Sequence, residues 1–173
     1  MKNDYKVRAQ KFIEDFFPYI EEALHRRAVH LYELSACVAR YCFEKHRYVI
    51  MESGCSRAVF ITSDYVVKYD YVKDAFCGNS SDELRAYQEI KKMGFEHLFA
   101  EISCYTYNGY NFYIMPRISG IQPFGDDDIL YGYLSYEEQN FIDEYFCDLH
   151  SGNFGFEKNQ LKIIDYAWNS LGK

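Results

Sequence analysis

Two carboxylates and an amide near the end of this 173-residue chain have types and a spacing that suit chemistry. Asn153 follows Asp148 by five residues, and Asp165 follows it by seventeen. One carboxylate of such a set can orient or deprotonate a hydroxyl, while an amide and a second carboxylate can hold Mg²⁺ against nucleotide phosphates. The three residues therefore indicate phosphoryl transfer.

A short hairpin is predicted between Asn153 and Asp165. The residues 154–156 alternate Phe and Gly, the polar run 157–160 is typical of a turn, and the apolar run 161–164 is typical of a strand. Asp165 then stands at the end of that strand. Because a strand pair is stiff, it can fix oxygen ligands at the short distances that Mg²⁺ requires.

The composition is that of a globular protein with an acidic balance. The chain is 49% hydrophobic and 26% charged, and its length suits one domain or two small lobes. A net charge of −7 argues against nucleic acid as a partner, since binding to its phosphates needs clustered Lys and Arg. A nucleotide with Mg²⁺ remains compatible with this charge. Eighteen Tyr and fourteen Phe predict a core of large aromatic residues.

The cysteines and the N-terminal residues predict a cytoplasmic setting. The six cysteines show no Cys-x-x-Cys spacing, so free buried thiols are expected. The start of the chain is too polar for a signal peptide, and no apolar run reaches the length of a membrane span. We therefore expect a reduced compartment and no membrane partner.

Two helices are predicted before residue 47. Apolar residues at steps of four predict an amphipathic helix near the N-terminus, and Pro18 within it predicts a kink or a break. A second helix is expected over Ala28 to Phe43. The residues expected to face inward are Phe12, Phe16, Ile20 and Leu24 in the first helix and Leu31, Leu34, Val38 and Tyr41 in the second.

The rest of the chain reads as strands interspersed with helices. Asn108-Gly109 is a strong hairpin signal, and Ser135 with Glu138 three residues later resembles a capping box. We expect strands over 48–51, 58–62, 65–69, 100–107 and 111–115, helices over 82–93 and 135–146, and a linker over 116–128.

This order of elements, from Tyr48 to Trp168, resembles the protein-kinase-like fold. The run 148–153, Asp-Leu-His-Ser-Gly-Asn, is similar to the catalytic loop of small atypical phage and bacterial kinases and of aminoglycoside phosphotransferases. The resemblance implies an α+β, two-lobed fold. Its parts are an N-terminal helical extension over 1–47, an N-lobe with a five-stranded antiparallel sheet over 48–118, and a minimal C-lobe over 119–173.

The resemblance assigns phosphate binding to residues of the predicted N-lobe. Gly54 and Ser56 lie where a glycine loop would cover the phosphates, although only one glycine is present. Lys68 lies in an apolar strand, where its ammonium must find an anion. The implied partners of Lys68 are the α- and β-phosphates and a helix glutamate, Glu83, with Glu89 as the alternative.

The adenine ring is assigned to the segment that leaves the last N-lobe strand. Met115 takes the gatekeeper position of the family. The carbonyl of Pro116 and the N–H of Ile118 would bind adenine, and the missing N–H of proline is no obstacle because only its carbonyl is needed.

The catalytic roles fall to the predicted C-lobe. Asp148 would be the base or the hydroxyl-orienting residue, and Asn153 and Asp165 would be the Mg²⁺ ligands. His150 would orient the loop or contact phosphate, and a purely structural hydrogen bond is its alternative.

The chain departs from the family after Asp165. Only eight residues follow, so an activation segment and the distal C-lobe helices have no room, and Ala167 replaces the usual glycine. We expect the apolar surface that this leaves to be covered either by the helices before residue 47 or by a second copy of the chain.

The resulting hypothesis is an ATP- and Mg²⁺-dependent phosphotransferase acting on a hydroxyl of a protein or small molecule. The alternatives are a nucleotide-binding pseudokinase or interaction module without transfer activity, and nucleotidyl transfer from the same fold. The expected partners are ATP and an acceptor that the sequence does not identify. The expected location is the cytoplasm, or the host cytoplasm if a phage encodes the chain.

Overall fold

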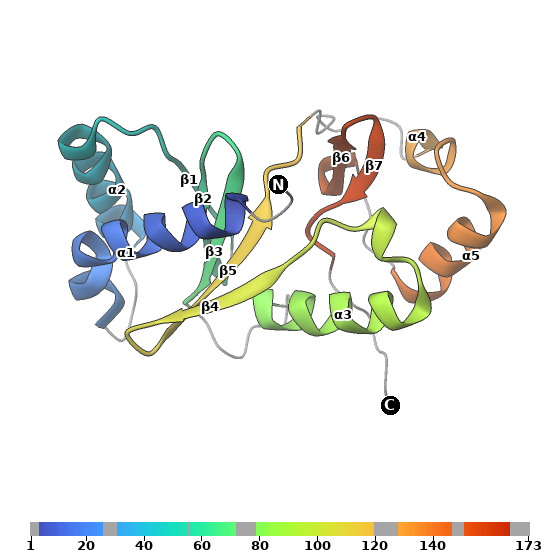
Figure 1. The fold of residues 1–173 in the computed structure, drawn as a ribbon, viewed down its shortest axis with the longest axis horizontal. Helices are drawn as coiled ribbons and strands as arrows, with labels where there is room; N and C mark the ends of the chain where they lie inside the picture. The colour runs from blue at the N-terminus through green and yellow to red at the C-terminus, as the bar shows by residue number, and fades with distance from the viewer. Residues whose placement is uncertain are drawn as a thin grey trace. The chain divides into compact units, whose positions relative to one another are not determined.

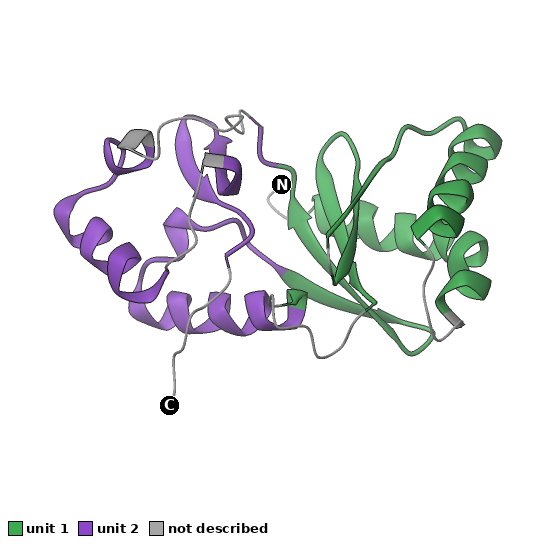
Figure 2. Cartoon of the chain, turned by 180° about the vertical axis from the view of Figure 1, so that it is seen from behind, with its two compact units in different colours: residues 1–80, 103–117 green, residues 81–102, 118–173 purple. Residues whose placement is uncertain are grey.

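The chain forms two compact units, each built from two separate stretches of sequence (Figure 2). Unit 1 contains Met1–Ser80 and Ser103–Arg117, and unit 2 contains Ser81–Ile102 and Ile118–Lys173. The computed structural model describes residues 4–25, 31–54, 56–71, 79–119, 128–146 and 151–166.

The two units group the chain differently from the three predicted segments. The N-terminal helices share a unit with the five-stranded sheet, and the helix after the third strand belongs from Ser81 onwards to unit 2. The lobe boundaries 1–47, 48–118 and 119–173 therefore stay a prediction of a kinase-like organisation.

Unit 1 is built on a five-stranded antiparallel sheet (Figure 1). Its spatial order is β1-β2-β3-β5-β4, which places β3 in the centre. The predicted α+β class with a five-stranded antiparallel sheet is confirmed. The strands are β1 (Ile50–Ser53), β2 (Arg57–Ile61), β3 (Tyr65–Asp70), β4 (Ser103–Tyr107) and β5 (Tyr110–Pro116).

Two helices, α1 (Asp4–His25) and α2 (Leu31–Lys45), pack on this sheet. The side chains predicted to face inward are buried against strand residues such as Phe60 and Ile114, except for Leu31, which is half-buried. The buried faces of both helices pack on the sheet of unit 1. The covering of the C-terminal part, by these helices or by a second copy of the chain, stays a prediction.

Pro18 does not end the first helix. Helix α1 continues through it to His25, so the predicted break is wrong, and the ribbon of α1 instead bends along its length (Figure 1). The burial of the α1 apolar face outweighs the backbone hydrogen bond that a proline removes.

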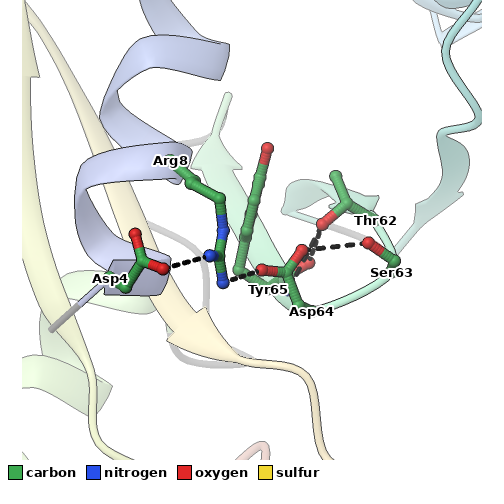
Figure 3. A network of polar contacts seen from close by, with 6 residues as sticks. All are labelled: Asp4, Arg8, Thr62, Ser63, Asp64 and Tyr65. Carbon is green, nitrogen blue, oxygen red and sulfur yellow. Dashed lines mark hydrogen bonds and ion pairs between the residues drawn. The ribbon is translucent and has the colours of Figure 1, made fainter. Parts of the chain in front are cut away.

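An ion-pair network ties the start of α1 to the turn between β2 and β3 (Figure 3). The guanidinium of Arg8 binds the carboxylates of Asp4, at 2.5 Å, and of Asp64. The turn is closed by Thr62, whose hydroxyl donates to the carbonyl of Tyr65 at 2.8 Å. Because the paired side chains are partly exposed, these ion pairs add little to stability, and they link the first turn of α1 to the β2–β3 turn.

Unit 2 combines helices with a two-stranded hairpin around an aromatic core. Phe95 stacks on Phe141 at 4.0 Å between ring centroids, and Phe99 contacts Phe146 and Tyr166 at 5.1 and 5.0 Å. The elements are α3 (Ser80–Met93, of which Ser80 belongs to unit 1), η1 (Glu96–Leu98), α4 (Asp128–Tyr131), α5 (Tyr136–Tyr145), η2 (Ser151–Asn153), β6 (Phe154–Glu157) and β7 (Gln160–Ile163).

Both predicted hairpins are present. Asn108 and Gly109, with φ of 48° and 81°, join β4 to β5, and Lys158 and Asn159, with φ of 52° and 65°, join β6 to β7. Two successive positive φ values produce a tight turn whose twist matches that of the strands. The turn residues therefore fix the register of each hairpin.

The described residues bear on two further expectations. No helix among them is long and apolar enough to cross a membrane. Cys37, Cys42 and Cys104 are free thiols, and the other three cysteines lie outside the described residues.

Candidate functional site

The predicted site residues are divided between the two units. Unit 1 contains Gly54, Ser56, Lys68, Met115 and Pro116. Unit 2 contains Glu83, Ile118, Asn153 and Asp165. Asp148 and His150 lie outside the described residues.

Lys68 occupies the middle of the central strand. Its cross-strand neighbours are Val59 on β2 and Tyr113 on β5, and its side chain is only 6% exposed. An ammonium group in such a position is costly unless anionic or polar atoms surround it. The burial of Lys68 therefore distinguishes it from an ordinary surface lysine.

Lys68 and Met115 project from the same face of the sheet. Val67 and Ile114 are cross-strand partners, and both belong to the core under α1 and α2. Because successive side chains in a strand point to opposite faces, Lys68 and Met115 lie on the face that these helices do not cover. The predicted phosphate-binding lysine and the predicted gatekeeper are thus brought together in unit 1.

Pro116 lies where its missing N–H costs the sheet nothing. The N–H of Arg117 donates to the carbonyl of Asp64 at 3.0 Å, so the adjacent pair, Tyr65 and Pro116, exchanges no hydrogen bond. The carbonyl of Pro116 consequently points away from β3, towards the β4 side of β5. Strand β4 begins at Ser103, which pairs with Ile114, so β4 does not extend as far as Pro116. Among the described strands none pairs with Pro116 on that side, so its carbonyl lies outside the ladder.

The turn between β1 and β2 is held tightly by backbone bonds. The N–H of Gly54 donates to the carbonyl of Arg57 at 3.0 Å, and the Tyr71 hydroxyl donates to the Gly54 carbonyl. A Cβ added to Gly54 would meet no atom within 4 Å. Ser56 is 1% exposed, and its carbonyl accepts the N–H of Tyr71 at 3.0 Å, which gives Ser56 a structural role.

Glu83 is the buried acid of α3. It is 1% exposed, whereas Glu89 pairs with Lys92 at 2.6 Å on the surface of the helix. The start of α3 is fixed by Asp70, whose carboxylate accepts the Ser80 N–H at 2.9 and 3.1 Å and the Ser80 hydroxyl at 2.6 Å. A carboxylate at a helix N-terminus satisfies N–H groups that have no partner within the helix.

Asn153 and Asp165 lie at the open end of the β6–β7 hairpin, where the two strands are not joined by the turn. Phe154 pairs with Ile163, and the N–H of Ile164 donates to the carbonyl of Asn153 at 2.7 Å. Asp165 follows directly, with a φ of 54° and an exposed side chain. Left-handed backbone is uncommon for residues other than glycine, although Asp adopts it more readily than most. Both predicted ligands therefore lie at the same end of the hairpin in unit 2, with Asn153 buried and Asp165 exposed.

Residues before and after Asp165 are hydrogen-bonded to Ala100, in the segment after α3. The N–H of Ala100 donates to the carbonyl of Ile163 at 2.9 Å, and the hydroxyl of Tyr166 donates to the carbonyl of Ala100 at 2.9 Å. The Tyr166 side chain is fully buried. Asp165 is thus held between two fixed neighbours, while its own side chain is open to solvent.

Glu83 lies close enough to this anchor to act on it electrostatically. Burial, and next the negative charge of Glu83, raise the pKa of Tyr166 well above its ordinary value, so the hydroxyl stays protonated as a donor. Glu83 therefore lies in the neighbourhood of Tyr166, the residue that follows Asp165.

The side-chain oxygens of Asn153 and Asp165 are of the kind that binds a hard cation. Mg²⁺ prefers carboxylate and amide oxygens, and Asn153 with Asp165 offers one of each. Among the described residues no group of three or more His, Cys, Asp or Glu side chains is arranged to hold a metal ion. A Mg²⁺ ion at this hairpin would therefore need water, phosphate oxygens or residues outside the described ranges to complete its shell.

Sequence reasoning missed two residues that position the candidate site. Asp70 holds the first turn of α3, and Tyr166 anchors the residue next to Asp165. Both act through backbone groups that are distant in sequence, and a single chain gives no signal for such pairings. The only available signal was the bulky aromatic residue directly after Asp165.

Comparison with known proteins gives low similarities. No family model and no curated protein matches the chain. The Legionella pneumophila Lpg2603 kinase bound to IP6 is a similar solved structure, with 14% identity, a TM-score of 0.46, and coverage of 75% of this chain and 51% of that chain. WbdD, solved with the kinase inhibitor LY294002, has 15% identity, a TM-score of 0.31, and coverage of 65% and 31%. The chain thus spans about half of the first structure and about a third of the second, and the similarities are too low to assign a family.

Proposed function

We propose that this chain is a kinase-type phosphotransferase that uses ATP and Mg²⁺ to phosphorylate a hydroxyl of a protein or small molecule. The observation that carries the proposal is the hydrogen bond from the Ile164 N–H to the Asn153 carbonyl, which holds the backbone of Asn153 against the residue that precedes Asp165. Asp165 follows Asn153 by twelve positions in sequence, and the hairpin register brings both residues to the same end of the strand pair. Such fixed oxygen pairs are what a Mg²⁺–nucleotide site needs.

Each half of the proposed site has its own task. Asn153 and Asp165 would hold Mg²⁺, which neutralises charge on the transferring phosphate when bound. Asp148 would accept the proton of the acceptor hydroxyl while that oxygen bonds to the γ-phosphorus and the bond from the γ-phosphorus to the ADP oxygen breaks. Lys68 would stabilise the phosphate charge, with Glu83 as its partner. The activity requires both sets of residues to act on one nucleotide.

The proposed adenine site rests on Met115 and Pro116. Met115 shares a sheet face with Lys68, and the Pro116 carbonyl points out of the ladder. A backbone carbonyl can accept a hydrogen bond from the edge of the adenine ring, and an apolar side chain can pack against its face. Ile118, which is buried in unit 2, would supply the N–H.

A nucleotide-binding protein without transfer activity is the second candidate. The burial of Ser56 favours it, because the turn after Gly54 then offers backbone groups but no exposed hydroxyl to the phosphates. A loose grip on the γ-phosphate slows transfer more than it weakens binding.

Nucleotide-dependent thermal stabilisation, measured with and without Mg²⁺, tests the proposal. ATP with Mg²⁺ is expected to raise the melting temperature of the wild type. In Asp165→Asn the additional increase that Mg²⁺ gives over ATP alone is expected to disappear. Glu157→Gln at the other end of the hairpin is the matched control and should behave as wild type. Lys68→Met should weaken binding with or without the metal.

Transfer of label from γ-labelled ATP then separates the two candidates. Label is expected on an acceptor in a cell extract and is expected to disappear with Asp148→Asn. Binding without transfer would favour the non-catalytic candidate, and label from α-labelled ATP would indicate nucleotidyl transfer. No stabilisation by any nucleotide would reject the whole proposal.

A further inference from the structure

Helix α2 has a second apolar face that no part of the described chain covers. Its buried face consists of Leu34, Val38 and Tyr41. The opposite face exposes Tyr32, Ala36, Ala39 and Phe43, which we call the α2 stripe. The side chains of Tyr32 and Phe43 are 86% and 82% exposed. Single exposed apolar residues are ordinary, but four aligned on one helix face form a contiguous patch.

The stripe has the spacing of a helix–helix seam. Its members follow one another at steps of four, three and four residues. Residues at these steps lie on one side of a helix, and the same alternation of three and four defines the contact positions of coiled coils. Ala36 and Ala39 in the middle leave room for a second helix to approach closely, while the aromatic residues at the ends provide the area to bury.

The stripe is complementary to itself when two copies run antiparallel. A two-fold axis between Ala36 and Ala39 places the Ala36 of one copy opposite the Ala39 of the other. The same axis places Tyr32 opposite Phe43, so small residues meet small ones and aromatic rings meet aromatic rings. A two-fold interface requires this property, because residue i must contact residue j in both directions. We propose that the α2 stripe is the interface through which two copies of this chain form an antiparallel dimer.

The charges beside the stripe fit the same arrangement. Glu33 and Arg40 are seven residues apart and therefore lie along one edge of α2. Antiparallel packing sets this edge against the same edge of the partner helix, so each Glu33 approaches the Arg40 of the other copy. Arg40 binds Glu44 of its own chain at 2.8 Å with a side chain that is 73% exposed, and its guanidinium can bridge both carboxylates. A parallel pair would not bring these opposite charges together.

The size of the patch predicts a weak dimer. A stable interface buries about 1,200 Å² or more in total, and a single pair of 15-residue helices lies near or below that limit. The dimer should therefore form in a concentration-dependent way. It does not depend on the proposed function, because α2 contains none of the proposed site residues.

Sedimentation velocity of the full chain, from about 1 to about 300 µM, tests the dimer. The wild type is expected to shift from monomer to dimer over this range. Phe43→Glu should weaken association at least about tenfold. The matched control is Tyr136→Glu, which removes an aromatic residue of similar exposure from α5 and should leave association unchanged.

A charge exchange tests the antiparallel arrangement. Arg40→Glu alone sets like charges against each other and should weaken the dimer, and adding Glu33→Arg should restore it. Because Arg40→Glu also removes the ion pair with Glu44 of its own chain, the melting temperature of each variant is measured alongside to separate loss of the dimer from loss of folding stability. The proposal would be overturned if the chain stayed monomeric throughout the concentration range, or if Phe43→Glu left the association unchanged.

Discussion

The backbone N–H of Ile164 donates to the carbonyl of Asn153 at 2.7 Å, one residue before Asp165. The backbone positions of the proposed Mg²⁺ ligands are therefore fixed by the pairing of the hairpin and by the residues that anchor it. Substituting Asn153 or Asp165 should change chemistry with little effect on the hairpin, whereas substitutions in the residues that anchor the hairpin should change both.

Removing the hydroxyl of Tyr166 tests that anchor. In Tyr166→Phe the carbonyl of Ala100 loses its buried donor, so the free energy of unfolding in urea should fall by about 1–3 kcal/mol. Mg²⁺-dependent nucleotide binding should also weaken, because Asp165 is the adjacent residue. Tyr133→Phe, which changes an exposed hydroxyl, is the control, and equal effects of the two changes would contradict the anchoring role.

The choice between Glu83 and Glu89 can be tested with isosteric substitutions. Glu83→Gln removes a buried charge and, if Glu83 is the partner of Lys68, should weaken nucleotide binding by about tenfold to a hundredfold in calorimetry. Glu89→Gln should have almost no effect, because that side chain pairs with Lys92 on the surface. The reverse order would assign the role to Glu89.

Much of the local structure was predictable because it is encoded over short distances. Asn108-Gly109 fixed one hairpin, the polar run 157–160 fixed the other, and Ser135 with Glu138 forms both hydrogen bonds of a capping box. In each case a few neighbouring residues decide the backbone conformation. The edges of strands were less predictable: β1 begins at Ile50, two residues later than expected, because pairing with β2 determines where a strand starts.

The tertiary arrangement was less predictable because it depends on distant contacts. Nothing in the N-terminal sequence says that α1 covers the sheet of unit 1, or that Arg8 binds Asp64. The spacing of the predicted site residues was readable, and the positions of Asn153 and Asp165 beside each other followed from the hairpin. The anchoring roles of Asp70 and Tyr166 were not readable.

A methyl group at Gly54 separates a folding role from a binding role. Gly54→Ala should change the free energy of unfolding by less than about 0.5 kcal/mol, since the added Cβ meets no atom within 4 Å. It should nevertheless weaken ATP binding if phosphates approach this turn. Gly109→Ala is the opposite control: its φ of 81° should make it destabilising, with no specific effect on ATP. A Gly54→Ala variant with unchanged ATP affinity would exclude the phosphate role.

Neutralising Asp70 should loosen the start of α3. Asp70→Asn removes a charged acceptor from the Ser80 N–H and hydroxyl, and should lower the free energy of unfolding by about 1–2 kcal/mol. Asp82→Asn weakens a surface pair with Arg85 and should cost less than Asp70→Asn. Urea unfolding of both variants makes the comparison, and equal losses would mean that Asp70 has no special role.

The capping box of α5 should make stability depend on pH in acid. Burial acts to raise the pKa of Glu138, but hydrogen bonds from His97 and Ser135 outweigh it, so the pKa is lowered from 4.5. A carboxylate with a lowered pKa stabilises the fold fully at a pH above its ordinary, unfolded-state pKa. This contribution is lost as the pH falls through the lowered pKa of the folded state. Glu138→Ala should therefore reduce the melting temperature at neutral pH and much less in strong acid. Glu137→Ala, the exposed neighbour, should show no such pH dependence.

The interleaving of the two units has a consequence for biosynthesis. The chain leaves unit 1 after Ser80, returns at Ser103 and leaves again after Arg117. A nascent chain can complete unit 1 at that point, but Ala100 obtains its partner only after Ile163 emerges from the ribosome. During that interval Phe99 lacks the ring of Tyr166 and the aromatic core of unit 2 is incomplete, so a stalled translation product should be a ready target for chaperones and proteases.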